Sequence, residues 1–336
     1  MRRDSGELQN IYLSLEKRIE NEMIDFPVEQ LFQYEFEIRK NIYKILFSGK
    51  ILNQKQAEYL LVKEKQSYCK SLIISGVFQF YDCTIQQLDA YLKNKNCLIR
   101  KKTLDYKYSL LGDVWDGLDD MLLDRSTGVR ERVVWILRKH SDFNVLDFYI
   151  NSLLGEYLII AIMGIGENGN KEQIRLLLPY LKNEDDKIVK TVILNLGKLM
   201  GYDGYELYWR YLMDERQEVS KSAYLSIRKN SIRYGAKKIF DEYKVNKMYH
   251  VRKYLVLLLM QENSWDRLPY LLNIYDDVEL MPLQDKIQMK IIHRDMYSKI
   301  SRDQAELIRI EVAKKEGLFP KKILEDINFD IKYRVG

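Results

Sequence analysis

Residues 176–197 read LLLPYLKNEDDKIVKTVILNLG, an apolar stretch, a polar turn and a second apolar stretch. In the second stretch Val189, Ile193 and Leu196 recur at the spacing of one face of an α-helix. The polar residues of the turn can cap this helix by accepting its free N–H groups. The stretch therefore predicts a unit made of a helix, a turn and a second helix.

The same pattern recurs along the chain about every 30 residues. We call the apolar residue that opens each second helix the anchor, and successive anchors are 31, 30, 30, 30, 30, 30 and 32 residues apart. A period of this size is typical of stacked repeats, in which each unit contacts mainly its neighbours. No segment combines polar–apolar alternation with hairpin signals, so strands are not expected. The anchors are Ile38, Cys69, Ile99, Val129, Ile159, Val189, Val219 and Val251.

The unit resembles the HEAT repeat, especially the short bacterial HEAT-like type first named from phycobilisome lyases. The shared features are the pattern of residues 176–197, the acidic turn before Val-Lys or Val-Arg, and the Leu-Gly or Ile-Gly pair at the end of a unit. The resemblance implies an all-α fold, a right-handed α-solenoid of about eight helix pairs whose second helices line the concave face. We expect an N-terminal region of degenerate or capping repeats at 1–82, a repeat array at 83–282, and a C-terminal helical cap and tail at 283–336.

Composition narrows the classes of protein that fit. Hydrophobic residues make up 46% of the chain, so it can bury a core. Its 54 basic and 49 acidic residues are too balanced to indicate nucleic-acid binding by themselves. The three cysteines and three histidines lack the spacings of a metal site, and we expect neither metal nor cofactor. No apolar run suits a signal peptide or a membrane span, so we expect no membrane partner and a cytoplasmic location.

A basic residue follows the anchor directly in six of the eight units and lies one place later in a seventh. Because the helix dipole disfavours a cation in the first helical turn by up to about 1 kcal/mol, each needs a compensating partner. Two interpretations stay open. The cations pair with turn acids such as Asp185, Asp186 or Glu218 in a ladder along the stack, or they form a row available to an acidic ligand. The seven cations are Arg39, Lys70, Arg100, Arg130, Lys190, Lys221 and Arg252.

Charge is also uneven along the C-terminal half. Residues 221–253 hold ten basic and two acidic residues, and residues 256–285 hold one basic and six acidic residues. Such a pair of patches suits an oppositely charged protein about as well as a phosphate backbone. Tyrosines among the cations could stack on bases or pack between repeats. We expect a non-catalytic scaffold that binds a protein or peptide with an acidic surface, with nucleic acid as the alternative partner. The candidate binding residues are Arg100, Arg130, Lys190, Lys221, Tyr224, Arg228, Arg252 and Tyr254.

A second resemblance is local. Residues 115–119, WDGLD, look like the Trp and Asp segment of HEAT-like alkylpurine DNA glycosylases. In that family a Trp and an Asp on one helix face hold the cationic damaged nucleotide, and an Arg of a later repeat binds the DNA backbone. The resemblance implies that Trp115 and Asp119 share a helix face and act at a catalytic site, with Arg130 or Arg132 nearby. This enzyme is the alternative to a scaffold without catalytic residues.

The unit at Ile159 differs from the others. Its helical stretch, residues 157–165, carries no charge and predicts either a buried layer or an apolar floor of the concave groove. Gly164, Gly166 and Gly169 spell GxGxxG, but a dinucleotide site needs a strand before the glycines. We expect these glycines to end the helix between two units instead.

Overall fold

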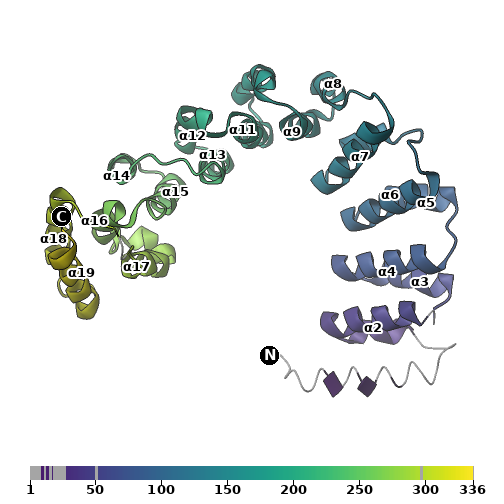
Figure 1. The fold of residues 1–336 in the computed structure, drawn as a ribbon, viewed down its shortest axis with the longest axis horizontal. Helices are drawn as coiled ribbons and strands as arrows, with labels where there is room; N and C mark the ends of the chain where they lie inside the picture. The colour runs from purple at the N-terminus through teal and green to yellow at the C-terminus, as the bar shows by residue number, and fades with distance from the viewer. Residues whose placement is uncertain are drawn as a thin grey trace. The chain divides into compact units, whose positions relative to one another are not determined.

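The computed structural model describes residues 9–10, 13–14, 17, 28–49, 52–295 and 298–335 (Figure 1). Regular structure in these residues is helical, and the only β-type pairing among them is an isolated bridge between Ile300 and Val335. The expected all-α fold is therefore confirmed. Most of residues 1–27, which belong to the predicted N-terminal region, lie outside the described residues.

The chain divides into two compact units, Met1–Val145 and Leu146–Gly336, which are described separately here. The division falls at the start of α8 (Val145–Asn151), ahead of the anchor Ile159. It coincides with neither expected boundary, 82/83 nor 282/283, and these two boundaries stay predictions.

In the first unit the second helices of successive repeats, which carry the anchors, pack against one another in chain order: α2 on α4, α4 on α6 and α6 on α7. The first helix of each repeat packs on the second, as α5 does on α6. Asn53 and Thr84 cap α3 and α5 with capping boxes, because Gln56 and Gln87 return the hydrogen bond. The elements are η1 (Val28–Gln33), α2 (Phe36–Ser48), α3 (Gln54–Lys63), α4 (Ser67–Phe80), α5 (Ile85–Leu92), α6 (Cys97–Leu111), η2 (Asp119–Leu123) and α7 (Thr127–His140).

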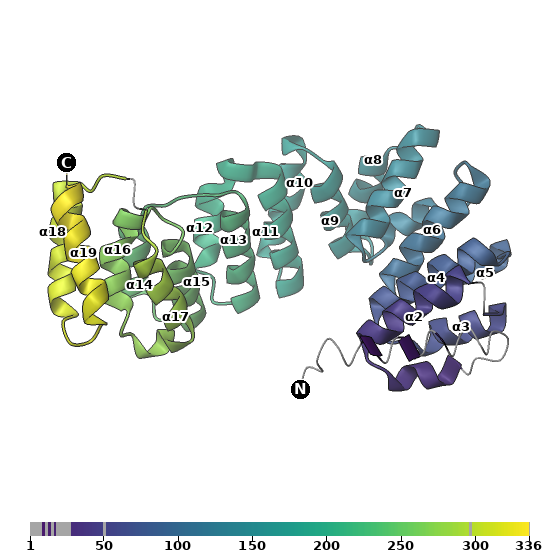
Figure 2. The ribbon, with the colours of Figure 1, turned by 60° about the horizontal axis from the view of Figure 1, so that its bottom comes forward.

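In the second unit α9, α11, α13 and α15 carry the anchors and pack in the same consecutive order (Figure 2). On the other layer α14 packs on α16, and α16 packs on α18. The elements after α8 are η3 (Ser152–Leu154), α9 (Leu158–Asn168), η4 (Lys171–Gln173), α10 (Ile174–Leu177), η5 (Leu178–Lys182), α11 (Asp186–Met200), η6 (Gly201–Gly204), α12 (Tyr205–Leu212), α13 (Gln217–Lys229), α14 (Ala236–Val245), α15 (Tyr249–Leu259), α16 (Ser264–Ile274), η7 (Val278–Leu283), α17 (Gln284–Ile292), α18 (Arg302–Lys314) and α19 (Lys321–Arg334).

Burial follows the anchor series with one exception. Every anchor except Ile159 is buried, as the helical pattern requires. In α9 the buried residues are Ala161, Ile162, Gly164, Ile165 and Gly166, and Ile159 is only half-buried. The helix in this unit is therefore rotated relative to the assumed anchor position.

The glycines of the GxGxxG pattern correct one expectation. Gly164 and Gly166 lie inside α9, and only Gly169 ends that helix. A Cβ on Gly164 would lie 2.3 Å from the Tyr149 ring, and one on Gly166 would lie 2.3 Å from Asn195 Oδ1. Two of the three glycines are thus required by close packing of neighbouring side chains rather than by a turn.

Candidate functional site

A side chain in the turn before most anchor helices fixes the backbone of that turn. The residue five positions before the anchor is usually Asn, Asp or Glu, and its side chain accepts a hydrogen bond from the backbone N–H two residues later. This arrangement holds the turn in the geometry that opens the next helix. Our reading of the sequence missed this residue, although its regular place before the anchor is visible there. The pairs are Glu64 with Gln66, Asn94 with Asn96, Asp124 with Ser126, Asp214 with Arg216, and Asn246 with Met248, at 2.7–3.0 Å.

In the first unit these turn acids also bind the cation that follows the preceding anchor. The Arg39 Nε donates to Glu64 at 2.9 Å. Arg100 donates through Nε and Nη2 to the two carboxylate oxygens of Asp124, both at 2.6 Å. Burial acts to raise the pKa of Glu64, but hydrogen bonds from Arg39, the Gln66 backbone and Tyr43 outweigh it and lower the pKa. The ladder interpretation is therefore observed at these two positions.

Two of the candidate binding residues are buried. Arg100 has only 8% of its side chain exposed, and Arg130 is fully buried. Arg130 donates to the Asp124 carbonyl at 2.6 Å and to Thr127 Oγ1 at 2.9 Å. This corrects the expectation of an exposed cation at both positions, because neither guanidinium is accessible to a ligand.

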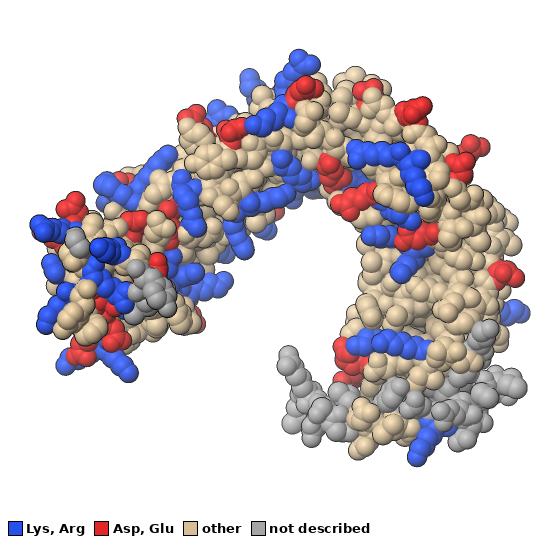
Figure 3. Space-filling model, in the orientation of Figure 1, with Lys and Arg blue, Asp and Glu red and all other residues tan. Residues whose placement is uncertain are grey.

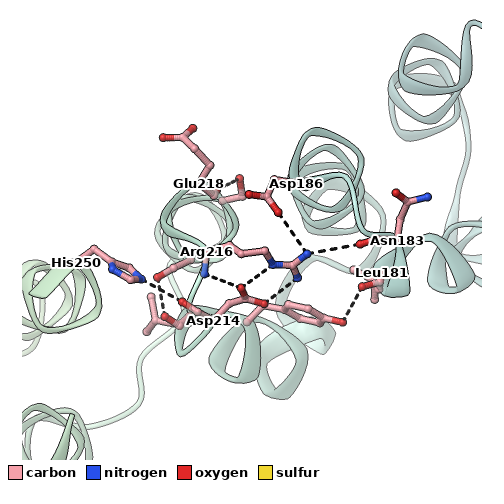
Figure 4. Close-up of polar contacts among 11 residues, drawn as sticks. Leu181, Asn183, Asp186, Asp214, Arg216, Glu218 and His250 are labelled. Carbon is pink, nitrogen blue, oxygen red and sulfur yellow. Dashed lines mark hydrogen bonds and ion pairs between the residues drawn. The ribbon is translucent and has the colours of Figure 1, made fainter. Parts of the chain in front are cut away.

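In the second unit an arginine inside the turn takes the same structural role. Arg216 donates through Nε and Nη2 to Asp214 at 2.9 and 3.0 Å, and through Nη1 to Asp186 at 3.4 Å (Figure 4). His250 Nε2 lies 3.0 Å from the Asp214 carbonyl oxygen. Burial acts to raise the pKa of Asp214, but the hydrogen bonds from Arg216 outweigh it and lower the pKa. These contacts join three successive repeats.

The side chain of Arg252 is also occupied within the fold. It pairs with Asp277 and Glu279, and its Nη2 donates to the Tyr243 hydroxyl at 2.8 Å. Burial acts to lower the pKa of Arg252, and Tyr243, Asp277 and Glu279 outweigh it and raise the pKa. The basic segment 221–253 and the acidic segment 256–285 therefore partly neutralise each other within one unit.

The two candidate tyrosines pack between repeats. Tyr224 of α13 and Tyr254 of α15 are both buried, and their rings stack at a centroid distance of 5.1 Å with an interplanar angle of 16°. Neither ring is open to stack on a base. Of the two roles considered for these tyrosines, the structure shows packing between successive anchor helices.

The remaining candidates lie on exposed faces of α11 and α13. Lys190 Nζ and Lys221 Nζ are 3.6 and 3.7 Å from the carboxylate of Glu218, and Arg228 is exposed. These separations exceed hydrogen-bonding distance, and exposed pairs of this kind contribute about 0–1 kcal/mol. Figure 3 shows Lys and Arg side chains gathered over α11, α13 and α15. We define the cation surface as Lys190, Lys198, Lys221, Arg228, Lys229 and Lys253.

The segment that resembles a glycosylase site has a different geometry from the one expected. Trp115 lies in the connection after α6, and Asp119 is the first residue of η2, so the two do not share a helix face. Gly112 ends α6 with a φ angle of +70°, and Gly117, between Trp115 and Asp119, has a φ angle of +80° in a turn. The Lys107 Nζ lies 4.9 Å from the centroid of the Trp115 ring and pairs with Asp89.

A cavity of about 900 Å³ lies between α14, α16 and α18. Trp265, Pro269 and Tyr270 form part of its apolar lining, and the lining residues Lys237 and Asp241 pair with each other at 2.5 Å.

The described residues contain no cluster of three or more His, Cys, Asp or Glu side chains that could hold a metal ion. Burial raises the pKa of the Cys69 thiol to about 11, which favours the unreactive protonated form. Within the described part of the chain, every helix is too short or too polar to cross a lipid bilayer.

Comparison with known proteins leaves the family of the chain open. No protein-family model matches the sequence, and no curated protein matches it.

Proposed function

We propose that this chain is a HEAT-like right-handed α-solenoid of about eight helix pairs that acts as a non-catalytic scaffold or adaptor. In this proposal the cation surface of the second unit binds a protein or peptide with an acidic surface, along a concave face lined by the second helices. A cytoplasmic location without a membrane partner belongs to the same proposal. Consecutive packing of the anchor helices supports the architecture.

The observation that carries the binding role is the contrast between two sets of cations that follow the anchors. Arg100 and Arg130 are buried in the fold, whereas Lys190 is half-buried and Lys221 is exposed, and both are only loosely paired with Glu218. Buried pairs are costly to disrupt, while exposed lysines can exchange one carboxylate for another at little cost. The cation surface holds six cations beside Glu167 and Glu218, so it keeps a positive balance.

The test is affinity purification with charge-reversed variants. Lys190→Glu/Lys221→Glu is expected to lose a partner that the unmodified chain retains, and that partner should dissociate as salt rises. Lys182→Glu/Lys247→Glu changes the same charge at exposed positions outside the cation surface and should retain the partner. Equal retention by both variants would show that the cation surface is not the binding site.

Nucleic acid is the second candidate, because a row of exposed cations also suits a phosphate backbone. Electrophoretic mobility of duplex DNA, measured across salt concentrations, separates the two. If the surface binds phosphate, the logarithm of the binding constant should fall steeply and linearly with the logarithm of the salt concentration. The slope of this line should be smaller for the Lys190→Glu/Lys221→Glu variant. A DNA glycosylase is not proposed, since Trp115 and Asp119 do not share a helix.

A further inference from the structure

The cation surface is divided by a row of apolar side chains. Met163, Leu194, Leu225 and Leu257 lie 31, 31 and 32 residues apart, one on each of α9, α11, α13 and α15. Leu194 and Leu225 are 36% and 39% exposed, and the other two are half-buried. Because these four helices pack consecutively, equivalent positions on them are neighbours. We name these four residues the apolar row.

Cations lie on both sides of the apolar row. In α11, Lys190 precedes Leu194 by four residues and Lys198 follows it by four. In α13, Lys221 and Lys229 flank Leu225 in the same way. Residues four apart share a helix face, and a separation of eight residues corresponds to about 12 Å along the axis. The two lines of cations are therefore about 12 Å apart, with the apolar row between them.

We infer that the cation surface and the apolar row bind an amphipathic α-helix of a partner protein, with acidic residues along both edges of its apolar stripe. This inference rests on the proposed function and specifies its ligand. An α-helix with its side chains is about 10–12 Å wide, which matches the separation of the two cation lines. Its apolar stripe covers the leucines, and its edge carboxylates meet the lysines on both sides.

The spacing of the row also defines the sequence pattern of the ligand. Packed helices have axes about 8–10 Å apart, and two turns of an α-helix advance about 10.8 Å. An apolar residue at every seventh position of the bound helix would thus meet one member of the apolar row. Four anchor helices span about 24–30 Å between their outer axes, the length of roughly 16–20 helical residues.

The apolar row favours a protein over a nucleic acid. Protein interfaces place apolar side chains at the centre and charged groups at the rim, which is the order found across α11 and α13. A phosphate backbone would bring charge along its whole contact line and would leave Leu194 and Leu225 without apolar partners.

The test uses two synthetic peptides of equal composition, each of about 20 residues and labelled for fluorescence anisotropy. The first places leucines at every seventh position and at the adjacent stripe positions, with glutamates on both edges. The second permutes the same residues so that leucines and glutamates are spread around the helix. The first peptide is expected to bind the full chain at least about tenfold more tightly than the second.

Variants of the chain locate the bound peptide. Leu194→Ser/Leu225→Ser is expected to weaken binding of the first peptide about tenfold. The control Leu154→Ser/Leu178→Ser changes two exposed leucines outside the apolar row and should leave the affinity within about twofold. Circular dichroism of each variant checks that it has folded.

The outcomes separate the inference from the proposed function. If the two peptides bind the chain with equal affinity, and both lose the same affinity for the Lys190→Glu/Lys221→Glu variant, the ligand is not an amphipathic helix. The proposed binding of an acidic partner would then still stand. Failure of both peptides to bind would also overturn the inference, and the affinity purification described above would then decide the proposed function alone.

Discussion

Replacing Asp124 with alanine is expected to destabilise the first unit by about 3–5 kcal/mol. The substitution leaves the guanidinium of Arg100 without the carboxylate to which it donates two hydrogen bonds of 2.6 Å. Only 8% and 9% of the two side chains are exposed, so water cannot replace the lost partner. A buried charge that loses its partner costs far more than an exposed one.

The matched control is Asp105→Ala. Asp105 pairs with Arg132 at the same distance, 2.6 Å, but 41% of its side chain is exposed. Its loss is expected to cost about 1 kcal/mol or less. The pair of variants thus compares the same ion-pair distance at two degrees of burial.

Native-state hydrogen exchange of the α6 amides measures the loss of stability around α6 itself. This local measurement is needed because a chain with two compact units need not unfold in a single transition. A loss of 3 kcal/mol or more accelerates exchange through opening by about a hundredfold or more. Arg100→Met/Asp124→Leu removes both charges and should recover much of the loss. If Asp124→Ala and Asp105→Ala differ by less than about 1 kcal/mol, burial does not control the strength of these pairs, and the reasoning is refuted.

Three further predictions concern other contacts. Gly166→Ala should lower the thermal unfolding midpoint and cost about 1–3 kcal/mol, because the added Cβ would lie 2.3 Å from Asn195 Oδ1; an unchanged midpoint would contradict this close approach. The pKa of Glu64 is lowered in the folded state, so its stabilisation is present above its ordinary pKa of 4.5 and is lost as the pH falls below that value; urea unfolding from pH 7 to pH 3 should therefore be less pH-dependent in Glu64→Gln. Cys97 is exposed and should react with a thiol reagent at pH 8 in the native state, whereas buried Cys69, with a pKa of about 11, should react only after unfolding; rapid labelling of Cys69 in the folded chain would contradict its burial.

The anchor series shows why the helices could be predicted from the sequence. Burial on one face of a helix requires apolar residues at fixed intervals. The positions of Val189 and Val219 in the sequence therefore predict that both are buried, as they are. The prediction fails at Ile159, because α9 buries Ala161, Ile162 and Ile165 and leaves Ile159 half-buried. A period of 30 residues carries no information on such a rotation.

The roles of the cations could not be predicted in the same way. Arg130 and Lys190 occupy the same place after their anchors, yet the first is fully buried and 34% of the second side chain is exposed. Arg130 donates to the Asp124 carbonyl in the turn before its own helix, whereas Lys190 lies 3.6 Å from Glu218 of the next repeat. Arg100 meets a carboxylate 24 residues away, and no spacing rule within one helix reaches that far.

The Trp115 segment shows the limit of a short motif. A spacing of four places two residues on one face only if the backbone between them is helical. Gly117 lies between Trp115 and Asp119 and adopts a positive φ angle, so the backbone between these two residues is not helical. The glycine was visible in the sequence and was the local signal against a shared face.

The contact between Gly197 and Ser226 has a consequence for what the second unit can recognise. A Cβ on Gly197 would lie 2.6 Å from the Ser226 hydroxyl, so α11 and α13 approach each other as closely as their side chains permit. A larger residue at either position would move the helices apart and lengthen the step from Leu194 to Leu225. The sizes of two buried residues, which touch no ligand, would then determine how well the spacing of the apolar row matches that of a bound helix.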